Sequence, residues 1–177
     1  GLTGVDRQPA PGGRAGRSLS PRTHVRSDLY GGSVGNGARF SVEVLSAMAA
    51  EIGGERVGIK ISPEMGFNDI ADATPVETYT HLVKTIASLN LAYLHLARTA
   101  ASFDYAAHLR PLFPGAFLLG GGLTQASAAQ RIAAGDADAV VFGSAYLHHP
   151  DLAERFALAP PLHPPHPAAF HPAADPA

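Results

Sequence analysis

Hydrophobic positions along the middle of this chain change period several times between helical and strand-like spacing. Apolar residues three or four positions apart, together with turn and capping residues, predict helices at 38–52, 75–89, 105–112, 124–134 and 150–158. Short runs rich in apolar residues between them predict strands at 56–62, 91–97, 116–119 and 138–142. The helix boundaries fit this division, because Gly53-Gly54 follows the first helix, Pro75 begins the second and Thr124 can cap the fourth.

Strands that alternate with helices predict a parallel sheet with crossover helices. Such crossovers are right-handed, so consecutive strands should lie side by side in chain order. The predicted fold class is therefore α/β, with about four β/α units, which is half of a TIM (β/α)8 barrel. The length of 177 residues is consistent with a half, since a whole barrel needs about 250 residues.

The two ends of the chain differ from this middle region in composition. Residues 1–18 are rich in Gly, Pro and Arg and show neither period, which predicts a disordered or loosely attached segment. Residues 160–177 are rich in Pro and His, and that density of Pro excludes helix and sheet interiors. The expected folded domain is therefore 19–159. A chain that opens on Gly1 rather than Met suggests a fragment or a processed product.

The strand predicted at 56–62 carries the first candidate for chemistry. Val57, Ile59 and Ile61 share one face, which should meet the helices, so Lys60 should point toward the barrel interior. Active sites of this fold lie at the C-terminal ends of the strands, where Lys60 is placed. By position alone, a structural ion pair or a solvent-exposed lysine explains Lys60 equally well. His95, on the next strand, could approach the same interior, although a hydrogen-bonded core histidine is the favoured interpretation.

Two glycine turns follow the third and fourth predicted strands. Gly120-Gly121-Gly122 ends one strand and Gly143-Ser144 ends the next. Glycine at a strand-to-helix turn lets backbone N–H groups approach a phosphate. A loop closure without a ligand is the commoner role for a single turn. If the four predicted strands are the fifth to the eighth of a barrel, the two turns follow the seventh and eighth strands, where barrels often bind phosphate.

Composition excludes several classes of function. The formal charge of −2 gives no basic surplus for nucleic acid, and no apolar run approaches the roughly 20 residues of a membrane span. Cysteine is absent, which fits a reducing compartment, and we expect a cytoplasmic location. The nine histidines lack the spacing of a metal site, so no metal is predicted.

One run of residues carries a specific resemblance. The run from Arg26 to Ser33 contains Asp28 and Tyr30-Gly31-Gly32, and is followed by Asn36, Arg39, Phe40 and then the strand Val57 to Pro63. This order resembles the Old Yellow Enzyme family of flavin-dependent ene reductases, and the likeness extends over about residues 19–170. The resemblance implies FMN as cofactor, NAD(P)H as reductant and an activated alkene as the small-molecule substrate.

The same resemblance implies roles for single residues. Lys60 would lie at N1 and O2 of the flavin, where the family usually has Arg, and Gly121, Gly122, Gly143 and Ser144 would bind the FMN phosphate. Ser144 departs from the family, which commonly has an arginine there that holds the phosphate. The hydroxyl of Ser144 brings no charge, and a charge-assisted contact is roughly twice as strong as a neutral one.

The family's substrate-binding residues have no counterpart in this sequence. They form a His-x-x-Asn or His-x-x-His pair on the fourth strand, which we expect to precede the region covered here, and residues 1–18 hold neither His nor Asn. No catalytic residue is therefore assigned. One hypothesis is the C-terminal part of an FMN-dependent ene reductase. Another is a non-catalytic truncated barrel that acts in assembly, with a second copy or a complementary half-barrel chain as partner. An unrelated phosphate-binding α/β protein is disfavoured by the Tyr30-Gly31-Gly32-Ser33 run.

Overall fold

The strands form one parallel sheet, as expected, but it has five strands rather than four. A computed structural model describes residues 3–7, 19, 26–64, 72–97, 102–158 and 162. The strand order in the sheet is β1-β2-β3-β4-β5, so strands that are neighbours in sequence are neighbours in space. The strands are β1 (Val5–Arg7), β2 (Val57–Ile61), β3 (Tyr93–Ala97), β4 (Ala116–Gly120) and β5 (Ala139–Val141).

The helices match the sequence-based boundaries closely. They are α2 (Val34–Ile52), α3 (Pro75–Ile86), α4 (Tyr105–Leu109), α5 (Gln125–Ala133), α6 (Ser144–His148) and α7 (Leu152–Leu158), with short 3-10 turns at Gly54–Arg56, Ala87–Leu89 and Arg110–Leu112. The Thr124 cap of α5 is confirmed, since its hydroxyl accepts a hydrogen bond from the backbone N–H of Ser127. The helix α6 was missed, because one short turn has no periodicity to detect.

Within residues 1–18, which the sequence predicted to be disordered or loosely attached, Val5–Arg7 form the edge strand β1 in parallel register with β2. Three residues cannot show a strand pattern in sequence, so this strand is defined by its tertiary contacts. The Arg7 guanidinium lies 5.4 Å from the centre of the Phe40 ring on α2. On the other face, the Tyr93 hydroxyl donates a 2.9 Å hydrogen bond to the Asp6 carboxylate. Residues 8–18 and all but Leu162 of the predicted tail 160–177 lie outside the described residues.

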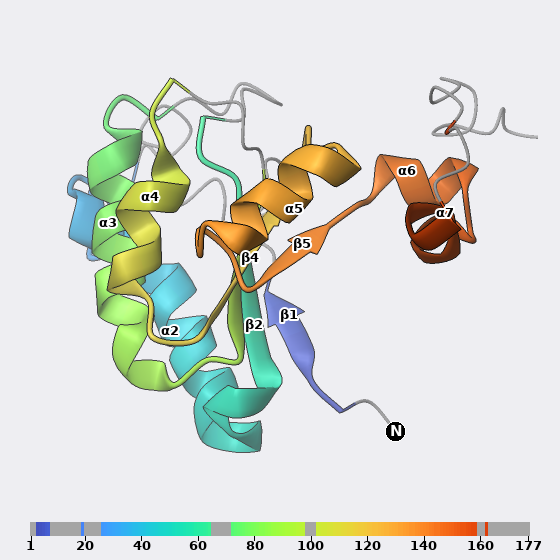
Figure 1. Ribbon diagram of the computed structural model, residues 1–177. Coiled ribbons are helices and arrows are strands. Elements are labelled where there is room, and N and C mark those ends of the chain that lie inside the picture. Colours follow the sequence, from blue (N-terminus) through green and yellow to red (C-terminus); the bar gives the residue numbers. More distant parts are fainter. Residues whose placement is uncertain are drawn as a thin grey trace, which may run out of the picture.

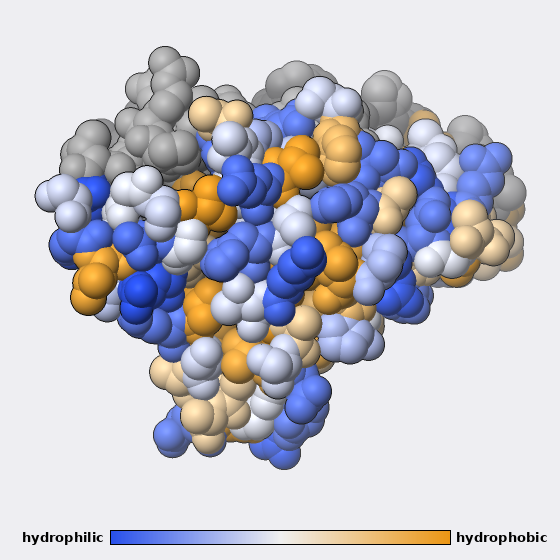
Figure 2. Space-filling view, turned by 90° about the vertical axis from the view of Figure 1, so that its left-hand side faces the viewer, coloured by the Kyte–Doolittle hydropathy of each residue, from blue (hydrophilic) through white to orange (hydrophobic). Residues whose placement is uncertain are grey.

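The hydrophobic core lies between the sheet and the helices α2, α3 and α4, which cover the same side of the sheet (Figure 1). Alternate residues of the central strands point into this core. They are Val57, Ile59, Ile61, Leu94, Leu96, Phe117 and Leu119, each at most 1% exposed. The outer surface of this layer mixes hydrophilic and hydrophobic residues (Figure 2). Among the described residues, no helix combines the length and apolar character needed to cross a bilayer.

Gly58 makes room for an aromatic ring on the other side of the sheet. A Cβ atom at position 58 would lie 2.2 Å from the ring of Tyr93, which stands beside Gly58 in the register of β2 and β3. The ring of Tyr93 crosses β2 here on its way to Asp6 on β1. Burial and then this hydrogen bond raise the pKa of Tyr93 to about 12. The side chain at position 58 must therefore be absent for β1, β2 and β3 to be joined in this way.

We predict that Gly58→Ala destabilises the protein by about 1–3 kcal/mol, because the added methyl group overlaps the Tyr93 ring. Urea unfolding followed by circular dichroism measures this change. Gly35→Ala is the matched control, since its Cβ in α2 would lie 3.6 Å from the nearest atom, His81 Nε2. Alanine favours helix over glycine, so the control should be neutral or slightly stabilising. Equal midpoints for both variants would contradict the overlap.

Candidate functional site

The sheet has a face covered by helices and an open face, and the candidate side chains Lys60 and His95 both lie on the open face. Lys60 on β2 stands beside His95 on β3, which stands beside Leu118 on β4. These residues lie on the face opposite the core. We call this the open face; its residues on the three central strands are Gly58, Lys60, Tyr93, His95, Ala97, Ala116, Leu118 and Gly120.

Lys60 lies on the open face near the C-terminal end of β2, as its spacing from Ile59 and Ile61 predicted. Its side chain is half-buried. None of the ion pairs of the described residues includes Lys60. The alternative of a structural ion pair therefore has no support within the described part of the chain. A half-buried ammonium without a counter-charge is suited to an anionic or oxygen-rich ligand.

His95 is more deeply buried than its neighbour Lys60, at 8% exposed. Its Nε2 atom is buried and has no hydrogen-bond partner among the residues that the structure describes. The favoured interpretation of a hydrogen-bonded core histidine was therefore wrong for this nitrogen. Burial, and secondly the charge of Lys60, lower the pKa of His95. The imidazole is thus held neutral beside a lysine, which leaves Lys60 as the positive charge of this pair.

The two glycine turns meet at one edge of the sheet. β4 and β5 are neighbours, with Gly120 beside Val141, so the turns that follow them lie side by side. Gly121 and Gly122 have φ values of 92° and 71°, a conformation that other residues rarely adopt. Gly143 has φ −96°, so only its lack of a side chain sets it apart. Ser144 begins α6 and is exposed.

Register places Lys60 and these turns on a common surface. Lys60 is two strands from β4, which corresponds to roughly 10 Å across the sheet. The C-terminal ends of β2, β4 and β5 therefore present a lysine, the Gly121-Gly122 turn and the Gly143-Ser144 turn within the dimensions of one nucleotide-sized ligand. These are the predicted site residues, and the structure brings them to the same edge of the sheet.

A carboxylate that the sequence analysis missed ties together the loops after β2 and β3. Glu64, with φ 57°, accepts hydrogen bonds from the Ser102 backbone N–H (2.9 Å), the Ser102 hydroxyl (2.7 Å) and the Tyr105 hydroxyl (2.9 Å). The Tyr105 ring packs edge-on against Tyr79 of α3, 6.4 Å between ring centres. Burial and then Glu64 raise the pKa of Tyr105. Glu64 and Ser102 are 38 positions apart, so no local pattern could have revealed the contact.

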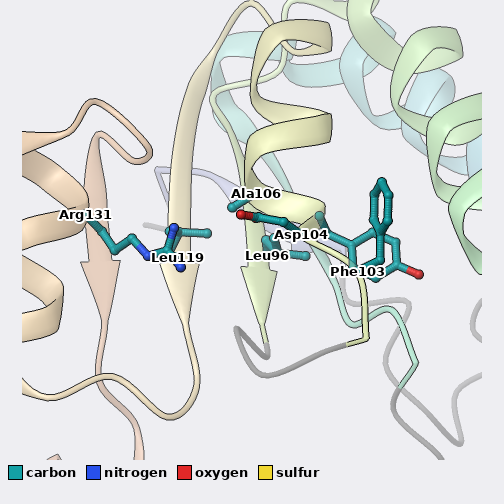
Figure 3. Close-up of a pocket in the computed structure, with 7 residues that line it drawn as sticks. Leu96, Phe103, Asp104, Ala106, Leu119 and Arg131 are labelled. Atoms are coloured by element: carbon teal, nitrogen blue, oxygen red, sulfur yellow. The ribbon is translucent and has the colours of Figure 1, made fainter.

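A small cavity lies on the helix side of the sheet rather than on the open face. Figure 3 shows Arg131 of α5 reaching toward Leu119, with Phe103 and Asp104 across from it. The cavity volume is about 10 Å³, enough for roughly one water molecule. Leu96 and Leu119 on its wall are core residues. This cavity is therefore not a cofactor site, and the open face remains the candidate.

The parallel α/β sheet with an open lysine-bearing face defines a partial barrel, and comparison with known proteins identifies its family. A profile described as the NADH:flavin oxidoreductase / NADH oxidase family matches residues 16–161. The chain belongs to this family. The expected Old Yellow Enzyme resemblance and the TIM-barrel fold class are thereby confirmed.

Individual relatives agree with this assignment. The chain is 36% identical over 176 residues to a probable flavin mononucleotide-dependent alkene reductase of Leishmania infantum, covering 97% of this chain and 48% of the relative. It is 32% identical to putative 12-oxophytodienoate reductase 11 of Oryza sativa subsp. japonica, covering 92% and 46%.

Solved structures show the same partial coverage. Morphinone reductase in complex with tetrahydroNAD superposes with a TM-score of 0.90 at 33% identity, covering 96% of this chain and 47% of that one. The old yellow enzyme from Trypanosoma cruzi gives 0.90 at 29% identity, covering 96% and 47%. The chain therefore spans about half the length of the relatives it matches, and it has the corresponding half of their fold.

The strand β1 precedes the four strands that the sequence predicted. If β5 is counted as the eighth strand of a barrel, as the two glycine turns suggested, β1 takes the fourth place. The residues that follow β1 in sequence are Gln8, Pro9, Ala10 and Pro11. None of them is His or Asn.

We predict that Glu64→Gln destabilises the protein by about 1–3 kcal/mol, because the amide keeps only one acceptor oxygen where the two carboxylate oxygens accept three hydrogen bonds. The pKa of Tyr105 should fall at the same time, since Glu64 no longer raises it. Urea unfolding and absorbance at 295 nm during an alkaline titration measure the two effects.

Glu51→Gln on the exposed end of α2 is the control for charge removal. It should leave both measurements unchanged. If Glu64→Gln unfolds at the wild-type urea concentration, the three contacts of Glu64 do not hold the two loops together.

Proposed function

We propose that this chain supplies the flavin-binding half of an FMN-dependent oxidoreductase of the ene-reductase type. The observation that carries the proposal is Lys60, a half-buried cation on the open face that forms no ion pair within the described residues. Family membership and the alkene-reductase name of one relative support the reaction class. Bound FMN, reduced by NAD(P)H, would supply the hydride that is transferred to an activated alkene.

The residues present fit this cofactor in the chemistry of their donors. Lys60 would hold the electron-rich N1 and O2 edge of the flavin through its ammonium group, a fixed charge that needs no reorganisation. The backbone N–H groups at Gly121 and Gly122 would face the phosphate, since their positive φ values turn the chain sharply there. The Ser144 hydroxyl would add one neutral hydrogen bond in place of a charge.

We assign no residue of this chain to proton donation or to substrate binding. The residues that follow β1 include no His-x-x-Asn or His-x-x-His pair, so the chain by itself would orient FMN without binding the carbonyl or nitro oxygen of the alkene substrate. This observation favours a second candidate, a non-catalytic half-barrel that acts only in assembly with another copy or with a complementary chain. On the open face, Ala116 is exposed and Lys60, Tyr93, Ala97 and Leu118 are partly exposed, which leaves surface for a partner.

Location and the remaining partners stay predictions from composition. A net charge of −2 and the absence of cysteine support a cytoplasmic protein without a nucleic-acid partner. The small-molecule partner proposed for the complete enzyme is an activated alkene. NADH and NADPH are both retained as reductants for the proposal.

We predict that the purified chain binds FMN saturably and that Lys60→Ala weakens binding by about tenfold or more, because the ammonium group is a charge-assisted donor. Quenching of flavin fluorescence during titration measures the dissociation constant. Lys84→Ala, an exposed lysine on α3, is the matched control and should bind as the wild type does.

Two other outcomes separate the candidates. Equal affinities of Lys60→Ala and wild type would remove Lys60 from the site. No saturable binding at high micromolar FMN, together with self-association in sedimentation velocity, would favour the non-catalytic assembly over the flavin-binding half.

We predict that Ser144→Arg tightens FMN binding by about tenfold, because a guanidinium forms a charge-assisted contact with a phosphate. Riboflavin, which has the same ring and ribityl chain without the phosphate, should bind wild type and Ser144→Arg equally. The two ligands therefore separate a phosphate contact from any general change in the site. A gain for both ligands would mean that position 144 does not face the phosphate.

A further inference from the structure

His95 stands between the two parts of the proposed flavin site. Its register partner on β2 is Lys60, and its ring reaches in the other direction to Gly120 at the end of β4. Gly120 is directly followed by the Gly121-Gly122 turn. The His95 side chain therefore lies beside Lys60 and also contacts Gly120, the residue that leads into the glycine turn.

The glycine at position 120 is required by the position of the imidazole. A Cβ atom there would lie 2.6 Å from His95 Nε2 and 3.3 Å from both Val141 Cβ and Val141 O. Within the described part of the chain, His95 Nε2 is buried in this contact without a hydrogen-bond partner. A proton on Nε2 would have no acceptor, so the neutral tautomer with its proton on Nδ1 fits the contact.

The charged groups that act on His95 belong to β1 and β2, the strands on one flank of β3. Lys60 on β2 disfavours a second positive charge, and Asp6 on β1 acts weakly in the opposite direction. On the other side, β4 brings Leu118 and Gly120 and β5 brings Val141, none of which titrates. Lys60 is therefore the charged group nearest to the imidazole in register among the described residues.

We propose that His95 is a positioning residue of the flavin site, a neutral imidazole wedged between Lys60 and Gly120 that keeps Lys60 the single positive charge of the pair and holds the glycine turn in place. The role of His95 in flavin binding rests on the proposed function, whereas the pairing of His95 with Lys60 does not. An imidazolium at this position would bring a buried N–H without an acceptor against Gly120, so protonation must displace the ring.

The pairing can be tested without any flavin. Imidazole resonances of the purified chain are titrated by NMR from pH 4.5 to 8, and His95 is assigned by its loss in His95→Phe. We expect the pKa of His95 to lie below that of an ordinary histidine in the wild type and to rise in Lys60→Met, because the neighbouring charge is gone. Lys60→Gln serves as a second variant in case Lys60→Met does not fold.

Lys84→Met is the matched control, since Lys84 is an exposed residue of α3 on the covered side of the sheet. It should leave the His95 titration at the wild-type pH. An unchanged titration in both Lys60 variants would overturn the pairing, whatever the outcome of flavin binding.

The positioning role is tested with riboflavin and FMN as the probes. His95→Phe keeps a ring of similar shape but removes both nitrogens, and Gly120→Ala pushes the ring away from the turn. At pH 7, we expect each change to weaken FMN binding by about tenfold, the usual size of an effect that acts through a neighbouring group.

The pH profile distinguishes positioning from mere packing. Wild-type affinity for riboflavin, which has no phosphate to titrate, should fall as the pH is lowered from 7 to 5, because His95 protonates and leaves its contact. In His95→Phe, the affinity for riboflavin should be independent of pH over the same range. Identical profiles would overturn the positioning role. A wild-type chain that binds neither flavin would contradict the proposed function and the positioning role, while the NMR result would still decide the pairing.

Discussion

The division of the sheet into two faces is the constraint on which the rest of this structure depends. Successive side chains of a strand point to opposite faces of the sheet. Wherever an apolar residue of β2 or β3 packs against the helices, the next residue therefore points to the open face. Ile59 and Ile61 are fully buried under the helices, and Lys60 between them is therefore obliged to stand on the open face. Core packing thus determines where the lysine points, before any ligand is considered.

Two glycines on the open face, Gly58 and Gly120, have no side chain and so leave room for neighbouring rings. Gly58 admits the ring of Tyr93, which reaches Asp6 and joins β1 to the sheet, and Gly120 admits the imidazole of His95. In both cases a methyl group would overlap the ring. These two glycines lie within strands, where glycine ordinarily weakens the structure. The close approach of a ring over a strand is the physical reason that each is present.

The C-terminal edge of the sheet combines rigid strand ends with loops that are tied to one another. Glu64 accepts three hydrogen bonds from Ser102 and Tyr105, so the loops after β2 and β3 are held together at the edge where Lys60 lies. The relatives that the chain matches are about twice its length. The chain therefore contains about half of the barrel fold of these relatives, and Lys60 and the two glycine turns lie at one edge of its sheet.

The sequence alone determined the order of strands and helices, the parallel α/β class, the direction of Lys60 and the family, because these depend on periodicity and on local motifs such as Tyr30-Gly31-Gly32-Ser33. Tertiary structure decided what local pattern cannot encode. The strand at Val5–Arg7 exists only through its pairing with β2 and its contacts to Phe40 and Tyr93. The unpartnered nitrogen of His95 likewise follows from contacts between residues far apart in sequence, whose geometry is set only when the strands pack side by side.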